Sequence, residues 1–202
     1  YEEINNKVES LLRELMNISD NYDVLFVQGG ATNQFSAVPL NIGTVNRKAD
    51  YILTGNFSTK AYEEGSRFVD AVAAASSKDK NFTYIPEIKA DMFRKDADYV
   101  HVCYNNTIFG TRYKEVPDTG NIPLVADMSS MILSQTVDVS KFALIYAGAQ
   151  KNVGPAGVTI VIVRHDFTER ADAKCPVMLR YADQVKNKSL YNTPPCFSTY
   201  VV

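Results

Sequence analysis

Hydrophobic residues gather along the chain in short runs rich in β-branched and aromatic side chains. Most of these runs are continuously apolar and do not alternate with polar residues, which is typical of strands covered on both faces in a mostly parallel sheet. Seven runs predict strands, at residues 24–28, 50–53, 69–73, 99–103, 124–127, 142–147 and 158–163. The pattern therefore predicts one sheet of about seven strands.

Three other segments repeat their apolar residues at helical spacing, with Ile4, Val8 and Leu11 on one face of the first. These segments predict helices at residues 1–16, 31–40 and 58–68. Ser58 is the expected N-cap of the third helix. Strands that alternate with helices and polar connections favour an α/β fold, a three-layer sandwich with helices on both faces of a mostly parallel sheet.

Composition narrows the possible functions. The chain has 202 residues, of which 46% are hydrophobic and 22% charged, as in ordinary globular domains. A net charge of −2 lacks the basic footprint of a nucleic-acid or anionic-membrane protein, and no apolar run approaches the ~20 residues of a membrane span. Three cysteines without CxxC spacing and two separated histidines predict neither a disulfide framework nor a metal site. This cysteine usage is typical of a cytoplasmic protein.

Both ends of the chain are unusual for a complete domain. The first helix begins without a preceding cap residue, and the last six residues are largely apolar, without a polar tail. We therefore expect the chain to be a piece of a longer protein.

The residues that follow each strand are the candidates for a site, because ligands bind outside the carboxyl ends of parallel strands. Gly29 and Gly30 follow the first strand and lead into a helix that begins with Ala31 and Thr32. Free backbone N–H groups at such a helix start favour a phosphate, although a tight connection is the alternative. The segment matches neither dinucleotide nor P-loop motifs.

Two charged residues close the fifth and sixth strands. Asp127 ends an apolar run, where it either caps a turn or pairs with a protonated nitrogen. Lys151 follows the sixth strand among glycine, alanine and proline. Burial there would remove hydration and favour the neutral, nucleophilic amine that a Schiff-base lysine requires. Phe57, after the second strand, either packs in the core or stacks on a flat ligand. Lysine, acid, phosphate cradle and aromatic ring together fit pyridoxal 5′-phosphate.

Several longer blocks carry a family resemblance, above all AGAQKNVGPAG at residues 147–157 and YNTPPCFS at residues 191–198. VLFVQGGATNQFSAVPLNI, ADYILTGNFSTKA and VADMSSMILSQTVDVSKF add to it. The chain resembles, nearly end to end, the phosphoserine aminotransferase family of class V, fold-type I pyridoxal-phosphate enzymes.

The resemblance implies roles for the residues already noted. Lys151 would bond to the cofactor aldehyde and later shuttle a proton, while Asp127 would pair with the pyridinium nitrogen. The backbone amides of Ala31 and Thr32 would hold the cofactor phosphate, and Phe57 would stack on the ring.

Four further residues follow from the resemblance alone. Gln150 would be another cofactor contact, and Thr107 would place its hydroxyl near the phenolic oxygen of the ring. Asn192 and Thr193 would reach across a homodimer to the phosphate of the neighbouring subunit.

The chain also departs from the family. Phe57 replaces a tryptophan common among relatives and offers a smaller ring, and Thr32 replaces an arginine that helps some relatives to hold the substrate phosphate. The family's N-terminal segment and C-terminal small domain are not matched. We therefore expect residues 1–202 to be the large, cofactor-binding domain alone.

Three functions follow. The first is transamination between glutamate and 3-phosphohydroxypyruvate, giving phosphoserine and 2-oxoglutarate for L-serine biosynthesis in a cytoplasmic homodimer. The second is another class V activity, such as cysteine desulfurase or small-amino-acid:glyoxylate aminotransferase. Desulfurases usually carry a histidine directly before the Schiff-base lysine. This chain has Gln150 at that position, which argues against the desulfurase activity. The third is a truncated module that binds cofactor or dimerises without turnover.

Overall fold

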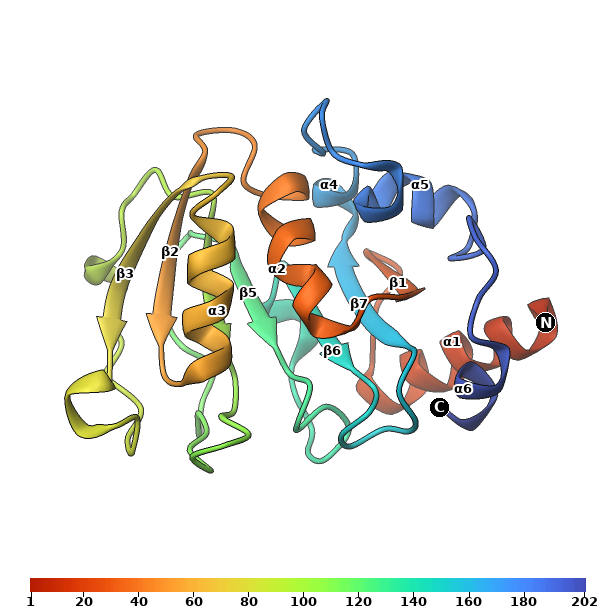
Figure 1. The fold of residues 1–202 in the computed structure, drawn as a ribbon, viewed down its shortest axis with the longest axis horizontal. Helices are drawn as coiled ribbons and strands as arrows, with labels where there is room; N and C mark the ends of the chain where they lie inside the picture. The colour runs from red at the N-terminus through yellow and green to blue at the C-terminus, as the bar shows by residue number, and fades with distance from the viewer.

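One mixed sheet of seven strands organises the protein, with the strand order β1-β7-β6-β5-β4-β2-β3 (Figure 1). The computed structural model describes all 202 residues. The strands are β1 (Tyr22–Val27), β2 (Lys48–Leu53), β3 (Asp70–Ser76), β4 (Tyr99–Cys103), β5 (Leu124–Asp127), β6 (Leu144–Gly148) and β7 (Thr159–Arg164). All neighbours from β3 to β6 pair in parallel, whereas β7 runs antiparallel to both β6 and β1. The prediction of a mostly parallel, seven-stranded sheet is confirmed.

The reversal of β7 follows from the short connection that precedes it. Residues 149–158 contain no helix, and a parallel return would need a longer crossover than this loop provides. β6 and β7 therefore form a hairpin-like pair, in which Gly148 lies opposite Thr159.

Helices cover both faces of this sheet and produce three layers. The longer helices are α1 (Glu2–Met16), α2 (Gly30–Asn41) and α3 (Asn56–Gly65), and the shorter ones are α4 (His165–Thr168), α5 (Tyr181–Lys186) and α6 (Cys196–Val201). Short 3-10 turns lie at Lys78–Lys80, Ala90–Met92, Val139–Lys141 and Val177–Leu179. α2 to α5 lie on one face, and α1 lies on the other together with α6 (Figure 1). No helix is long and apolar enough to cross a membrane.

Two hydrophobic clusters correspond to these two faces. Phe35 of α2 and Ala61 of α3 pack with Tyr51, Tyr99 and Tyr146 of the sheet. On the other face, residues of α1 pack with the strand side chains that point to that face and with the loops around residues 104–142. Every strand except β3 is mostly buried, which explains the continuous apolar runs in the sequence. The edge strand β3 has no buried residue.

The predicted elements match the observed ones with shifts of a few residues at their ends. β3 runs further than expected, to Ser76, and α3 begins at Asn56 and not at Ser58. Ser58 stands inside the first turn, where its Oγ accepts hydrogen bonds from Thr54 N at 2.9 Å and Gly55 N at 3.0 Å. The expected N-cap is therefore wrong in position, although the hydroxyl does satisfy backbone N–H groups. The short helices α4, α5 and α6 lacked a periodic signal long enough to predict them.

One of the two histidines is buried and the other lies on the surface. His101 is buried, with its Nε2 2.8 Å from Tyr146 Oη, and burial lowers its pKa to about 3. His165 lies at the start of α4, more than half exposed, and its Nδ1 is 2.7 Å from Asp23 Oδ2. Cys103, Cys175 and Cys196 are free thiols.

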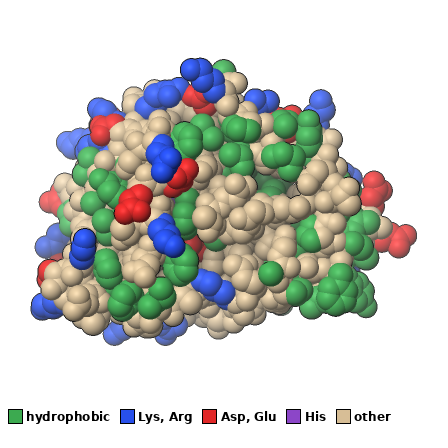
Figure 2. All heavy atoms as spheres, viewed as in Figure 1, with side chains coloured by type: hydrophobic (Ala, Val, Ile, Leu, Met, Phe, Trp, Pro, Cys, Tyr) green, Lys and Arg blue, Asp and Glu red, His purple; other side chains and the backbone are tan.

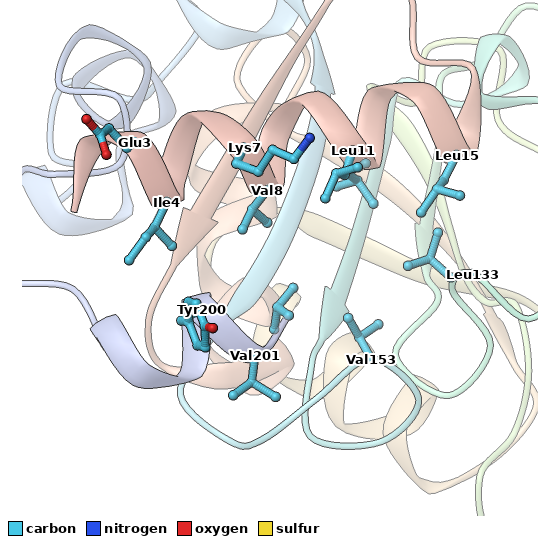
Figure 3. A pocket seen from close by; sticks show the side chains of 12 residues that line it. Glu3, Ile4, Lys7, Val8, Leu11, Leu15, Leu133, Val153, Tyr200 and Val201 are labelled. Atoms are coloured by element: carbon cyan, nitrogen blue, oxygen red, sulfur yellow. The ribbon is translucent and has the colours of Figure 1, made fainter.

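An apolar groove of about 390 Å³ runs along α1, where Ile4, Val8 and Leu11 face Tyr200 and Val201 of the last helix (Figure 3). The same end of the molecule gathers hydrophobic side chains on its surface (Figure 2). Exposed apolar residues there include Leu15 at 69% and Tyr200 at 69%, so this region is the least covered part of the apolar surface.

Candidate active site

The site lies at the carboxyl ends of the parallel strands, where the loops after β2, β4, β5 and β6 meet. Lys151 follows β6, and its Nζ donates to Thr107 Oγ1 at 2.6 Å and to Ser130 Oγ at 3.1 Å. The two hydroxyl oxygens are themselves 2.5 Å apart. The Phe57 ring centroid lies 4.6 Å from the same Nζ. Three residues from three separate segments, Thr107, Ser130 and Phe57, thus surround the Lys151 amine.

Lys151 is exposed, so the expectation that this lysine is buried is wrong. The residues that follow it, including Gly154 and Ala156, form a turn. Openness at this point leaves the amine accessible to a ligand that approaches from solvent. No carboxylate lies within ion-pair distance of Nζ, so hydroxyl groups alone hold it.

Asp127 closes β5 and is buried, with 7% of its surface exposed. Its Oδ1 accepts hydrogen bonds from Ser129 N at 2.9 Å and Ser129 Oγ at 2.6 Å. Its Oδ2 has only the Cys103 thiol nearby, with Sγ 4.0 Å away. No helix begins here, so the carboxylate caps a turn with one oxygen and leaves the other without a strong donor.

Burial dominates the protonation behaviour of this carboxyl group. Desolvation raises the pKa of Asp127, while the hydrogen bonds from Ser129 and the charge of Lys151 act in the opposite direction. A buried carboxylate with one unpaired oxygen binds a cationic N–H group strongly, because that group restores the lost solvation.

The predicted phosphate cradle lies at the start of α2. Gly29 (φ 94°) and Gly30 (φ 70°) both adopt the left-handed backbone region that disfavours side chains, and they turn the chain sharply from β1 into the helix. The first N–H groups of α2, including those of Ala31 and Thr32, have no partner within the helix. Gly29 and Thr32 border a hollow that is also lined by Lys60 and Arg67 and by Glu63 and Glu64, so its charged side chains balance.

Phe57 packs in the core, which is one of the two alternatives considered from the sequence. Its side chain is partly buried and packs against the hydrophobic cluster under α2 and α3. Its ring also lies near the amine of Lys151. The ring therefore forms one wall of the site while anchored in the core.

The other expected residues lie around this centre. Gln150 is exposed and folds over Gly148, where an added Cβ would stand 2.7 Å from Gln150 Oε1. Asn192 and Thr193 are exposed, and the backbone oxygen of Thr193 accepts from Gln28 Nε2 at 2.8 Å. Thr193 thus lies beside the end of β1, next to the cradle.

Three residues of the site were not expected from the sequence, namely Ser129, Ser130 and Cys103. Both serines are the last residues of the block VADMSS, which contains Asp127 and was the available signal. Cys103 ends β4 and faces the same edge, but a single cysteine carries no such signal.

The whole chain, residues 1–202, matches the family model described as "Aminotransferase class-V". The chain belongs to the class-V aminotransferase family.

Among curated relatives, the phosphoserine aminotransferase of Lysinibacillus sphaericus is 50% identical over 202 residues, and that of Bacillus cereus is 54% identical over 201 residues. Each match covers 100% of this chain and 56% of the relative. The chain therefore spans a little more than half the length of these relatives.

Solved structures agree. The phosphoserine aminotransferase from Bacillus circulans subsp. alkalophilus has a TM-score of 0.93 and 44% identity, covering 100% of this chain and 56% of that chain. A pyridoxal-phosphate-bound phosphoserine aminotransferase from Trichomonas vaginalis has a TM-score of 0.87 and 37% identity, with 98% and 56% covered. The expected fold and the family resemblance are confirmed.

Proposed function

We propose that the full-length protein is a pyridoxal-phosphate-dependent phosphoserine aminotransferase. It would transfer an amino group between glutamate and 3-phosphohydroxypyruvate, giving phosphoserine and 2-oxoglutarate in L-serine biosynthesis. The observation that carries the proposal is the placement of an accessible lysine amine and a buried, half-paired carboxylate at one sheet edge, in a chain about half identical to phosphoserine aminotransferases.

The residues present fit the cofactor. The open Oδ2 of Asp127 matches a protonated ring nitrogen, because a buried carboxylate with one free oxygen lacks only a cationic donor. The free amides of Ala31 and Thr32 match a phosphate at a helix start. When bound, pyridoxal phosphate supplies an aldehyde for a lysine amine and an electron sink for substrate carbanions.

Each residue then has a defined task. Lys151 provides the amine that bonds to the aldehyde and afterwards holds and moves a proton at Nζ. Asp127 keeps the proton on the ring nitrogen, and Phe57 presents a π face to the ring. Thr107, whose Oγ1 accepts from Lys151 Nζ at 2.6 Å, would offer its hydroxyl to the phenolic oxygen of the ring. Gln150 adds a polar contact beside the lysine.

Substrate recognition is proposed to depend on parts of the protein outside this chain. The match covers 56% of the relatives. We assign residues 1–202 to a large, cofactor-binding domain. We assign the groups that hold the substrate carboxylate and phosphate to an N-terminal segment and a C-terminal small domain. On this basis the 202 residues alone bind cofactor without completing a turnover.

A cytoplasmic homodimer with a shared site completes the proposal. Asn192 and Thr193 are exposed beside the end of β1, which leaves their side chains available to the phosphate of a neighbouring subunit. Three free cysteines support a reducing compartment.

The deciding experiment is turnover of glutamate with 3-phosphohydroxypyruvate by the full-length protein, followed as phosphoserine formed. The same protein assayed with glyoxylate or with cysteine as substrate provides the comparison with other class V activities. Faster turnover of either alternative than of 3-phosphohydroxypyruvate would contradict the assigned substrate.

The 202-residue chain, assayed alongside, tests the division of labour. We expect it to bind pyridoxal phosphate and to show no turnover. A measurable rate from this chain alone would refute the assignment of substrate groups to other segments.

A further inference from the structure

Ser129 occupies a buried position between the acid and the lysine loop. Its hydroxyl donates to Asp127 Oδ1 at 2.6 Å and accepts from Gly148 N at 3.0 Å, while its own backbone N–H donates to the same Oδ1 at 2.9 Å. Only 3% of Ser129 is exposed. One side chain therefore joins the end of β5 to the end of β6.

The two ends of this link are both functional in the proposed reaction. On β5, the bonds from Ser129 occupy one carboxylate oxygen completely, so the carboxyl plane is fixed and Oδ2 stays open. On β6, Gly148 is the last strand residue, three positions before Lys151. A single hydroxyl thus fixes the acid relative to the segment that carries the amine.

We propose that Ser129 is a positioning residue that holds Asp127 ionised and oriented toward the cofactor ring, and that ties this carboxylate to the lysine-bearing strand end. The inference rests on the proposed function, because that function pairs the open Oδ2 of Asp127 with the protonated ring nitrogen of the cofactor. It adds a residue to the site that neither composition nor the family resemblance had assigned.

Other groups around Asp127 do not replace this role. From β4, the Cys103 thiol is a weak donor, and its pKa is raised well above the ordinary value by burial. From β6, Tyr146 is neutral, because burial also raises its pKa. Lys151 is the one cation that acts on the carboxyl group, and it lies beyond ion-pair distance. The bonds from Ser129 are therefore the main direct stabilisation of the ionised form.

The test uses pyridoxamine 5′-phosphate, which has no aldehyde and so binds without bonding to Lys151. Its affinity for the full-length protein is measured by fluorescence from pH 8 to pH 6. Ser129→Ala removes the hydroxyl, Ser129→Cys weakens the donor at nearly the same shape, and Ser129→Thr retains it. Ser134→Ala, an exposed serine in the same turn segment, is the matched control.

Loss of the hydroxyl lets Asp127 protonate at a higher pH, so the carboxylate that pairs with the ring nitrogen disappears as pH falls. Relative to the unsubstituted protein, Ser129→Ala should bind about tenfold more weakly at pH 6, where its Asp127 is protonated more often, and by a smaller factor at pH 8. Ser129→Cys should fall between, and Ser129→Thr and Ser134→Ala should follow the unsubstituted protein. Using ratios at each pH cancels the titration of the ligand itself.

A ratio that is the same at pH 8 and pH 6 for both Ser129→Ala and Ser129→Cys would overturn the inference, because a purely structural serine weakens binding uniformly. If Ser129→Ala does not fold, as judged by circular dichroism, the Cys and Thr variants decide the question by the same ratio. The unsubstituted protein failing to bind pyridoxamine phosphate would overturn both the cofactor assignment and this inference. A pH-dependent ratio without turnover of 3-phosphohydroxypyruvate would support Ser129 and refute only the substrate.

Discussion

Asp50 on β2 and Asp127 on β5 are two buried aspartates of the same sheet, separated by β4, and they differ in how completely they are paired. Asp50, 1% exposed, accepts from Arg94 N at 2.7 Å with one oxygen and from Arg94 Nε at 2.7 Å with the other. Asp127 has one oxygen held by Ser129 and the other near only a thiol. A fully paired buried carboxylate stabilises the fold, whereas a half-paired one is ready for a ligand.

Their surroundings support the same distinction. Arg94 also donates to the backbone oxygens of Ala49 and Asp70, so it ties the loop before β4 to β2 and β3. That contact lies away from the carboxyl ends of the strands. Asp127 ends its strand and faces the edge where ligands of such sheets bind.

The largest expected effect comes from the amine beside Asp127. Lys151→Ala in the full-length protein should lower transamination at least about 10⁴-fold, because both the covalent bond and the mobile proton are lost. Borohydride reduction in the presence of pyridoxal phosphate should label the unsubstituted protein at Lys151 and leave the variant unlabelled. Lys186→Ala, an exposed lysine at the end of α5, is the control. Equal labelling of the Lys151 variant would place the bonded lysine elsewhere.

The next effect concerns the half-paired carboxylate itself. Asp127→Ala should reduce kcat about 10²- to 10³-fold, since a buried electrostatic contact to the reacting group is removed. Asp138→Ala, at an exposed aspartate with a similar turn-capping bond, should keep full activity. A kcat for the Asp127 variant within threefold of the unsubstituted protein, roughly the noise of such comparisons, would end the assignment of this residue to the ring nitrogen.

Asp50, the fully paired carboxylate, should affect the stability of the fold and not the activity. Asp50→Ala should lower the free energy of unfolding by about 2–3 kcal/mol, because Arg94 loses a buried charged partner while keeping Asp70. Urea unfolding of the apo protein measures this loss, and cofactor affinity in the folded variant should be unchanged. A double-mutant cycle with Arg94→Ala should give strongly non-additive losses. Additive losses would mean that the two residues stabilise the fold independently.

A smaller expected effect is the pH dependence that Asp127 gives to the free energy of unfolding. The pKa of Asp127 is raised above its ordinary value of 3.8 by burial, so its contribution to stability is present below that value and is lost as pH rises through the folded pKa. Asp127→Asn removes this dependence, and the apo variant should equal or exceed the unsubstituted protein in stability by about 1 kcal/mol at pH 7. Unfolding free energies from pH 4 to pH 7 provide the measurement. A variant less stable throughout that range would show that the carboxylate is fully paired in the apo protein.

The smallest effect belongs to a partly exposed carboxylate, Asp23. Its hydrogen bond raises the pKa of His165 above the ordinary 6.5, so this stabilisation is complete below pH 6.5 and is lost as pH rises through the folded pKa. Because the imidazole is 55% exposed, solvent screening limits the loss to under about 1 kcal/mol. His165→Asn should abolish the difference in unfolding free energy between pH 6 and pH 8 that this pair produces. If the difference in unfolding free energy between pH 6 and pH 8 persists unchanged in the variant, other groups cause it.

The fold was largely predictable because every strand except β3 is mostly buried and appears as an apolar run. Seven strands and three helices followed from that pattern, with errors at their ends such as the start of α3 at Asn56. The direction of β7 did not follow, because periodicity contains no information about strand orientation. The helices α4 to α6 are too short for a periodic signal.

The site was predictable only in part. Asp127 and Lys151 each stood out because a charge closes an apolar run, a property of the local sequence. Ser129 and Ser130 did not, because serine is ordinary in loops and their importance depends on Asp127, Gly148 and Lys151 arriving beside them. The exposure of Lys151 was also missed, since it depends on how the following turn is packed.

The sequence alone determined which residues form strands, which residues close them, and that a lysine and an aspartate end neighbouring apolar runs. Local hydrophobic patterning is sufficient for these conclusions, because burial on both faces of a strand requires continuous apolar residues. Tertiary structure decided that β5 lies between β4 and β6, and that one carboxylate oxygen of Asp127 is occupied while the other stays open. Such pairing depends on contacts between segments distant in the chain, and the free energy of packing the whole sheet selects them.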